Sequence, residues 1–328
     1  MHTVTTALTP SGPQDTMSTV KHVLRENTLL LAIVLLLGVA GAFAPAIFRA
    51  ENLANMALQF APLGIVVVGQ MLVILVRGLD LSVSSVMATS AVIATSFSGS
   101  NADLVWIVPL ALGTGALVGL ANGLLVTKRN VSPFLATLAT MIMLQGARNA
   151  WTQGAPSGNV PPLLRELGAG MTQGLPNNAL PLVCIAVLTY VLLHKSSFGR
   201  RMYLVGGSPN AARLVGVAVS RVTITAYVLS GVFAAVSGII LSGYVSVVDN
   251  WVGKNFELDS IVAAVMGGIA LSGGKGGVQG ALLGAAILVL LSNAVVIVGL
   301  PIHIQLVMKG FIIVAAAALY VAKSKVRS

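Results

Sequence analysis

The chain has 328 residues, of which 56% are hydrophobic and only 9% carry a fixed charge. Soluble domains average about 25% charged residues, so this composition excludes a soluble enzyme, a nucleic-acid-binding domain and a disordered chain. The net charge of +10 instead indicates a membrane protein with basic loops on its cytoplasmic side. The single cysteine, Cys184, excludes an internal disulfide and a cysteine-cluster metal site.

Two segments of unequal length are predicted along the chain. Residues 1–26 begin with a polar stretch rich in Thr, Ser and Pro, which predicts a flexible cytoplasmic tail. Residues 27–328 form a transmembrane domain, because they contain ten apolar runs of about the length needed to cross ~30 Å of hydrocarbon. These runs are approximately 28–47, 59–76, 81–98, 104–127, 133–150, 178–194, 222–246, 259–272, 277–299 and 303–322.

The distribution of basic residues sets the expected orientation. With the N-terminus inside, 14 of the 19 Lys and Arg residues fall in inside segments, whereas most acidic residues fall outside. We therefore expect an all-α membrane protein of about ten transmembrane helices with both termini in the cytoplasm. The eighth run is short and Gly-rich, which predicts a tilted, broken or re-entrant span.

The two halves of the chain carry similar landmarks in the same order. Asp80, Met87, Asn122 and Pro133 mark the first half, and Asp259, Met266, Asn293 and Pro301 mark the second. The first set begins inside and the second outside, which is the pattern of an inverted-topology repeat. Asp and Pro also favour helix starts in general, so the same pattern arises without a repeat.

Several polar side chains fall in or near the expected spans. Asp80 is interpreted either as an N-cap paired with Arg77 or as a residue of the translocation pathway. The other polar residues either bond between helices or line a polar path, and Lys309 is expected to snorkel or to pair. Those other residues are Gln70, Asn122, Gln145 and Asn293. The candidate pathway residues are therefore Gln70, Asp80, Asn122 and Asn293.

No catalytic or phosphate-binding motif is expected in this chain. The Gly-rich segment 272–277 fails as a phosphate-binding loop, because Ile269 stands where a Gly is required and Gly276 where Ser or Thr is required. We expect no cofactor and no metal. The acidic residues lie at span ends, which weakens the alternative of an ion-coupled secondary transporter of small polar solutes.

The longest inside loop, about 195–221, contains a predicted short helix. Ser208 is a good N-cap, Pro209 a favoured first residue and Gly216 a natural terminator, so the helix spans about 209–215. It leaves Leu214 and Val215 facing water. The helix either lies on the inner leaflet with Arg anchors or docks a cytoplasmic partner.

The same loop carries a family resemblance. Residues 198–213 resemble the inner-loop motif of permease subunits of ribose-type ABC importers. Further matching segments are 78–82, 122–128, 133–138, 266–284 and 309–310. The chain departs from the usual pattern at Arg77, Ser84, Ser85 and Ser132.

The resemblance implies a permease with a type II ABC importer-like fold that is not itself an enzyme. It implies a separate cytoplasmic ATPase, a periplasmic or extracellular sugar-binding protein and a second permease chain, identical or related. It also implies a bacterial inner membrane or plasma membrane and a monosaccharide or polyol as solute. The residues expected to couple the chain to the ATPase are Gly206, Gly207, Pro209, Ala212, Arg213 and Leu214.

Overall fold

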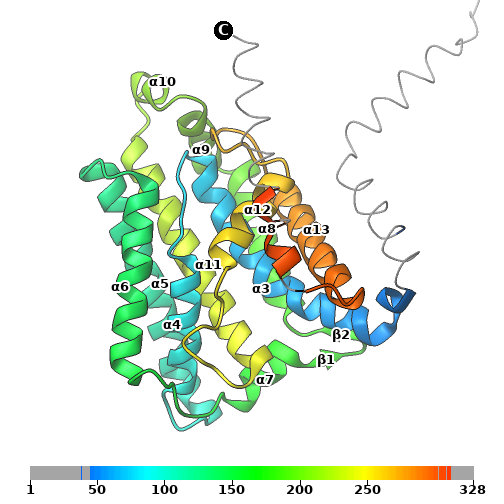
Figure 1. Cartoon of the computed structure of the whole chain (residues 1–328). Helices are drawn as coiled ribbons and strands as arrows, with labels where there is room; N and C mark the ends of the chain where they lie inside the picture. Colours follow the sequence, from blue (N-terminus) through cyan, green and yellow to red (C-terminus); the bar gives the residue numbers. More distant parts are fainter. Residues whose placement is uncertain (1–37, 39–44, 302, 308, 312–328) are drawn as a thin grey trace, which may run out of the picture.

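The computed structural model describes residue 38 and residues 45–301, 303–307 and 309–311, and these are mostly helical (Figure 1). The expected tail at 1–26 and most of the first and last expected spans lie outside these ranges. The helices are η1 (Pro45–Phe48), α3 (Ala50–Leu75), α4 (Val83–Thr95), η2 (Asn101–Asp103), α5 (Leu104–Lys128), α6 (Pro133–Thr152), α7 (Pro162–Ala169), α8 (Ala179–Lys195), α9 (Ser197–Gly207), α10 (Pro209–Leu214), α11 (Val219–Val245), α12 (Phe256–Met266) and α13 (Val278–Ile297). A two-residue antiparallel hairpin, β1 (Met171–Thr172) and β2 (Leu175–Pro176), joins α7 to α8.

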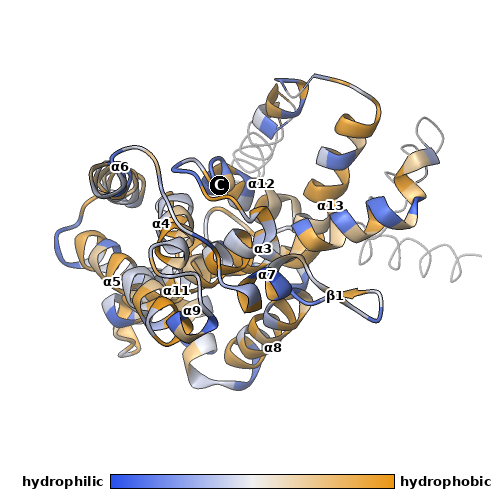
Figure 2. Cartoon of the chain, turned by 90° about the horizontal axis from the view of Figure 1, so that it is seen from below, coloured by the Kyte–Doolittle hydropathy of each residue, from blue (hydrophilic) through white to orange (hydrophobic). Residues whose placement is uncertain are grey.

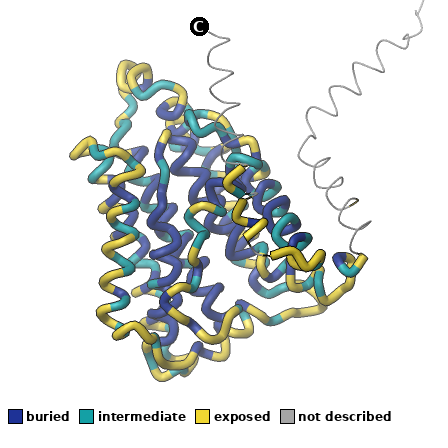
Figure 3. Tube along the Cα trace, in the orientation of Figure 1, coloured by how far each residue is buried: buried dark blue, intermediate teal, exposed yellow. Residues whose placement is uncertain are grey.

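Helices α3 and α11 form the centre of the molecule (Figures 1 and 3). Most of α3 is buried, and its buried face packs against the middle of α11. Pro62 interrupts the backbone hydrogen bonding of α3, and its carbonyl accepts a hydrogen bond from Ser237 Oγ of α11 at 2.7 Å. Further along α3, Gly69 contacts Ser230, which lies earlier in α11 than Ser237. The two helices therefore run antiparallel.

Small residues allow α5 to approach α11 closely. Gly115, Gly119 and Gly123 of α5 face Gly231, Tyr227 and Ile224 of α11, with backbone against backbone. A Cβ atom at Gly115 would overlap the carbonyl of Gly231. Glycine is favoured at such positions in membrane proteins because dispersion contacts and close packing, rather than the hydrophobic effect, hold helices together in lipid.

The packing has an internal symmetry. Apart from its contact with α7, helix α11 packs against α3, α4 and α5, and apart from its contact with α8, α3 packs against α11, α12 and α13. The pattern is unchanged when α3, α4 and α5 are exchanged with α11, α12 and α13. Since α3 and α11 run in opposite directions, this is the arrangement that an inverted repeat predicts.

The described helices differ in length from the expected spans. Across the described ranges, four helices are long and apolar enough to cross a membrane, namely α3, α5 with η2, α11 and α13. A fifth results if α8 and α9, which meet at a bend of 76°, count as one span. Helices α4 and α12 have only 13 and 11 residues, fewer than the ~20 of a full crossing. Ten spans therefore remain a prediction, and the short eighth run agrees with the short α12.

The outer surface of the bundle is apolar. Hydrophobic residues cover helices at its rim as well as at its centre, and α6 is exposed along much of its length (Figures 2 and 3). Large exposed side chains include Trp106 and Leu117 of α5, Ile142 and Met143 of α6, and Leu188 of α8. An apolar surface of this extent suits hydrocarbon, and the chain is a multi-pass membrane protein.

We predict that Gly115→Leu destabilises the fold, because the added side chain would push α5 away from the backbone of α11. Overpacking of this kind costs about 1–3 kcal/mol. Gly113→Leu is the matched control, since a Cβ atom at Gly113 meets no other atom within 4 Å. Melting temperature in detergent and the monodisperse fraction on size exclusion measure the effect. An equal loss of stability in both variants would contradict the close approach of α5 to α11 at Gly115.

Candidate functional site

The loop helix expected at 209–215 is present as α10 (Pro209–Leu214). Ser208 Oγ accepts a hydrogen bond from Ala211 N at 3.2 Å, and Pro209 is the first helical residue. Gly216 ends the helix with a φ of 79°. The local pattern predicted this cap and this end because both depend on neighbouring residues only.

Helix α10 presents an apolar tip. Leu214 and Val215 are 89% and 70% exposed. Arg213 beside them is also exposed and donates to Asn210 Oδ1 at 3.1 Å. In contrast, Ala212 is buried and contributes to the main hydrophobic core. One side of α10 is therefore packed into the molecule, and the other side is exposed.

The α9–α10 hairpin rests on a glycine turn between α12 and α13. Gly206 lies against the backbone of Gly274 and Leu75, where a Cβ atom would overlap both. Gly274 N donates to Leu75 O at 2.9 Å, and Tyr203 Oη donates to Gly276 O at 2.9 Å. The segment interpreted as a turn, 272–277, thus supports the hairpin that carries the exposed tip.

Arg77 fastens the end of α3 to the same hairpin. Its backbone has a φ of 67°, and its side chain donates to the carbonyls of Gly206 at 2.7 Å and Gly207 at 2.5 Å. The expected pairing of Arg77 with Asp80 is therefore wrong. The left-handed backbone at Arg77 accompanies a side chain that reaches the hairpin, and no ion pair joins it to Asp80 within the described residues.

Asp80 is fully buried behind this turn. Its carboxylate accepts hydrogen bonds from Ser82 N at 3.0 Å, Ser82 Oγ at 2.6 Å and Ser230 Oγ at 3.0 Å. Ser82, rather than Asp80, occupies the N-cap position of α4. Asp80 thus joins the start of α4 to α11, which lies 150 residues further along the chain.

Two further candidate pathway residues belong to the Asp80 cluster. In the amide orientation that satisfies both bonds, Gln70 donates to Asp80 O at 3.0 Å and accepts from Asp80 N at 3.2 Å. Asn122 donates to Ser82 Oγ at 2.9 Å and accepts from Thr140 Oγ1 at 2.7 Å. All three candidates are fully buried, so this placement favours interhelical bonding over lining a path.

The fourth candidate lies elsewhere. Asn293 of α13 exchanges two hydrogen bonds with Asn52 of α3, at 3.0 and 2.9 Å. The Asp of the second half, Asp259, forms an ion pair of 2.7 Å with Lys309. The positive charge expected in the last span is therefore paired, whereas Asp80 in the first half is held by hydroxyl and amide groups.

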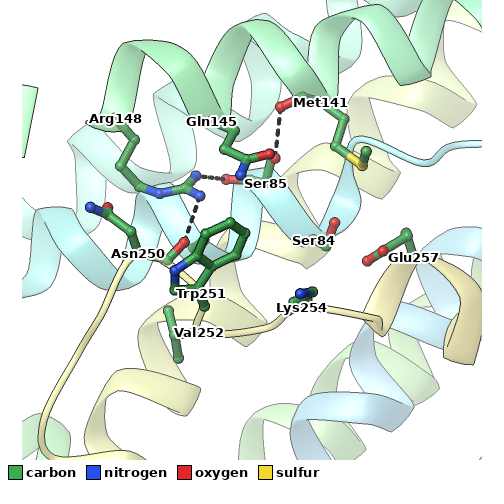
Figure 4. Close-up of a pocket in the computed structure, with 11 residues that line it drawn as sticks. Ser84, Ser85, Met141, Gln145, Arg148, Asn250, Trp251, Val252, Lys254 and Glu257 are labelled. Atoms are coloured by element: carbon green, nitrogen blue, oxygen red, sulfur yellow. Dashed lines mark hydrogen bonds between the residues drawn. The ribbon is translucent and has the colours of Figure 1, made fainter. Parts of the chain in front are cut away.

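A cavity of about 140 Å³, lined by both polar and apolar residues, opens between α4, α6 and the loop before α12 (Figure 4). Arg148 of α6 lies at one side, donating to Asn250 O at 2.9 Å and to Ser85 O at 3.3 Å. Trp251 lies at its mouth, and Lys254 Nζ sits 4.9 Å from the centre of its ring. The other lining residues are Ser84, Ala88, Met141, Gln145, Val252 and Glu257.

Sequence reasoning did not assemble this cavity. Of its lining residues, only Gln145 is among the polar span residues singled out from the sequence. The lining comes from three separated segments, residues 84–88, 141–148 and 250–257, and the polarity of Arg148, Asn250 and Glu257 alone gives no partner. None of the four candidate pathway residues lines it.

Comparison with known proteins assigns the chain to a family. Residues 52–317 match the model of a family described as a branched-chain amino acid transport system / permease component. The ribose import permease protein RbsC of Bacillus subtilis (strain 168) is 36% identical over 291 residues, 88% of this chain and 90% of the relative. RbsC of Escherichia coli (strain K12) is 34% identical over 297 residues, 89% and 92% of the two chains.

A more distant relative has a different named solute. The galactose/methyl galactoside import permease protein MglC of Haemophilus influenzae is 29% identical over 316 residues, 90% of this chain and 94% of the relative. No solved structure matches the chain. The chain belongs to the family of ABC importer permeases that includes the ribose import permeases.

We predict that Asp80→Leu lowers the folded yield, because three buried donor groups would lose their acceptor. Each unsatisfied buried donor costs about 1–3 kcal/mol. Asp80→Asn retains an acceptor oxygen and should be mild. Yield and melting temperature in detergent measure both, with the exposed Glu51→Leu as control. Loss of transport in Asp80→Asn at normal yield would show that the charge itself is used.

Proposed function

We propose that this chain is the permease subunit of an ATP-driven, binding-protein-dependent importer that moves a monosaccharide or related polyol into the cytoplasm. Relatives named for ribose and galactose import support a sugar as the solute. The observation that carries the proposal is the α9–α10 hairpin, which joins an exposed apolar tip to the end of α3 and to the glycine turn before α13. A partner that pushes on this tip acts on the core of the bundle.

The proposed partner at the tip is a separate cytoplasmic ATPase. Leu214 and Val215 offer the apolar contact, and Arg213 can pair with an acidic side chain of the partner. Gly206, Gly207, Pro209 and Ala212 then hold the tip in place. A binding protein on the opposite side and a second permease chain complete the proposed transporter.

The proposal also fixes an orientation. It puts α9, α10 and the glycine turn in the cytoplasm, with both termini on the same side and ten spans in total. The exchange of α3–α5 with α11–α13 supports an inverted repeat with its axis in the membrane plane. The short α4 and α12 are the broken spans of the two repeats.

Transport should require ATP hydrolysis by another chain. Proteoliposomes that contain this chain, its ATPase and its binding protein should take up D-ribose or D-galactose only with ATP. Removal of the ATPase should abolish uptake. Uptake by this chain alone, driven by a proton or sodium gradient, would instead support the secondary transporter.

Changes at the tip of α10 should weaken the ATPase contact. Truncating one side of a desolvated charged pair costs about 2–5 kcal/mol, so Arg213→Glu should reduce co-purification of the ATPase and uptake together. Leu214→Asp should do the same by placing a charge in the apolar contact. Leu175→Asp is the matched control, since Leu175 of β2 is 71% exposed and lies outside the α9–α10 hairpin. If both tip variants co-purify with the ATPase and take up sugar as well as the unmodified chain, α10 does not dock the ATPase and instead anchors the loop on the inner leaflet.

A further inference from the structure

We propose that the cavity between α4, α6 and residues 246–255 is the place where the solute contacts this chain during passage. The ligand it fits is a neutral polyhydroxylated molecule such as a pentose or hexose. This inference rests on the proposed function and assigns its solute contacts to residues outside the Asp80 cluster.

The lining offers hydrogen-bonding groups that the protein leaves unused. Arg148 Nε, Asn250 Oδ1 and Glu257 Oε2 are buried and have no hydrogen-bond partner in the described structure. Unsatisfied buried polar atoms are uncommon in native proteins, because each costs about 1–3 kcal/mol. The three residues that carry these atoms line the cavity, so its wall holds both donors and acceptors, which suits hydroxyl groups because they donate and accept at once.

The cavity also has an apolar face. Trp251 is 56% exposed at its mouth, and Ala88 and Val252 add further apolar lining. An indole ring can pack against the C–H face of a sugar while its surroundings bond the hydroxyls. The volume of about 140 Å³ is several times what a single water needs, so the cavity has room for a small solute.

The position of the cavity in the fold fits solute passage. Both short helices begin beside it, α4 with Ser84 and α12 with Glu257 in their first turns (Figure 4). Transporters with inverted repeats bind their solute at the repeat interface, where interrupted helices end. The loop before α12 reaches α4 directly, since Gly253 would place a Cβ atom 3.4 Å from Met87 Cβ.

The charged groups of the lining are compatible with a neutral ligand. Arg148 and Glu257 bring charges of both signs to the cavity, and Arg148 is held in place by two carbonyls and one hydroxyl. A sugar hydroxyl can donate to the Glu257 carboxylate. The labelling experiment below therefore compares neutral sugars with an anionic one.

The hydrogen-bonding atoms of Asp80 and Asn122, in contrast, are occupied within the protein. Asp80 accepts three hydrogen bonds and Asn122 bonds on both sides of its amide. A solute would have to displace these bonds to reach them. The cavity needs no such exchange.

Thiol labelling tests whether the cavity is accessible. The complete transporter is prepared in a Cys184→Ser background, which removes its single permease cysteine, and carries either Ser84→Cys or Ser90→Cys. Both serines are buried on α4, but only Ser84 lines the cavity. A charged methanethiosulfonate should label Ser84→Cys at least about tenfold faster, a difference of ~1.4 kcal/mol in barrier. Equal rates would overturn the proposal.

The same assay distinguishes the class of solute. Saturating D-ribose or D-galactose should slow labelling of Ser84→Cys, whereas ribose 5-phosphate should not. Protection by the phosphate alone would overturn the neutral ligand. Protection by neither sugar, in a transporter that imports one of them, would overturn the site.

Uptake by variants gives an independent measure. Trp251→Leu and Glu257→Gln should each reduce sugar uptake about tenfold, equivalent to ~1.4 kcal/mol, with ATPase co-purification unchanged. Trp106→Leu and Glu51→Gln, at exposed positions outside the cavity, should retain normal uptake. Normal uptake by both cavity variants would overturn the proposal. Lack of uptake by the unmodified transporter would count against the proposed function, while sugar protection of Ser84→Cys would still support the site.

Discussion

The structure depends on one buried carboxylate at the break between α3 and α4. Asp80 accepts three hydrogen bonds, and these fix the start of α4 against Ser230 at the middle of α11. A buried charge without such partners is strongly unfavourable, so the segment after Arg77 has little freedom. Gln70 holds the same segment from the side of α3 by bonding both backbone groups of Asp80. The two central helices and the first interrupted helix are therefore fixed together at a single point.

Close backbone contacts extend this fixed centre outward. Glycines bring α5 against α11, and Gly267 and Gly284 bring α12 against α13 in the same manner. Contacts between backbones leave little space for adjustment, because there are no side chains to repack. The rim is different. Helix α6 is exposed along much of its length, and its side chains Arg148 and Gln145 close the cavity on one side. The solute contact we propose thus lies between a fixed wall and a more loosely held one.

The sequence predicted the features that depend on neighbouring residues. Helix α10, its Ser208 cap and its Gly216 end follow from spacing alone, as do the long apolar helices α5 and α11. The sequence could not predict partners across the fold. The spacing of three residues favours a pair between Asp80 and Arg77, but Arg77 reaches Gly206, 129 residues later. The cavity was missed for the same reason, since its polar residues come from three separated segments. The sequence identifies which polar residues lie in the spans. Only the packing of the helices shows that Gln70, Asp80 and Asn122 form one buried cluster, whereas Asn293 bonds to Asn52.

The position of Gly206 at the base of the α9–α10 hairpin determines which helices a force on the hairpin can reach. Gly206 touches both the end of α3 and the glycine turn before α13, so the hairpin contacts both helix groups, α3–α5 and α11–α13, at one point. In the proposed transporter these groups are the two repeats, and the interrupted helices α4 and α12 belong one to each. A force applied at Leu214 would then reach both repeats through the same glycine contact.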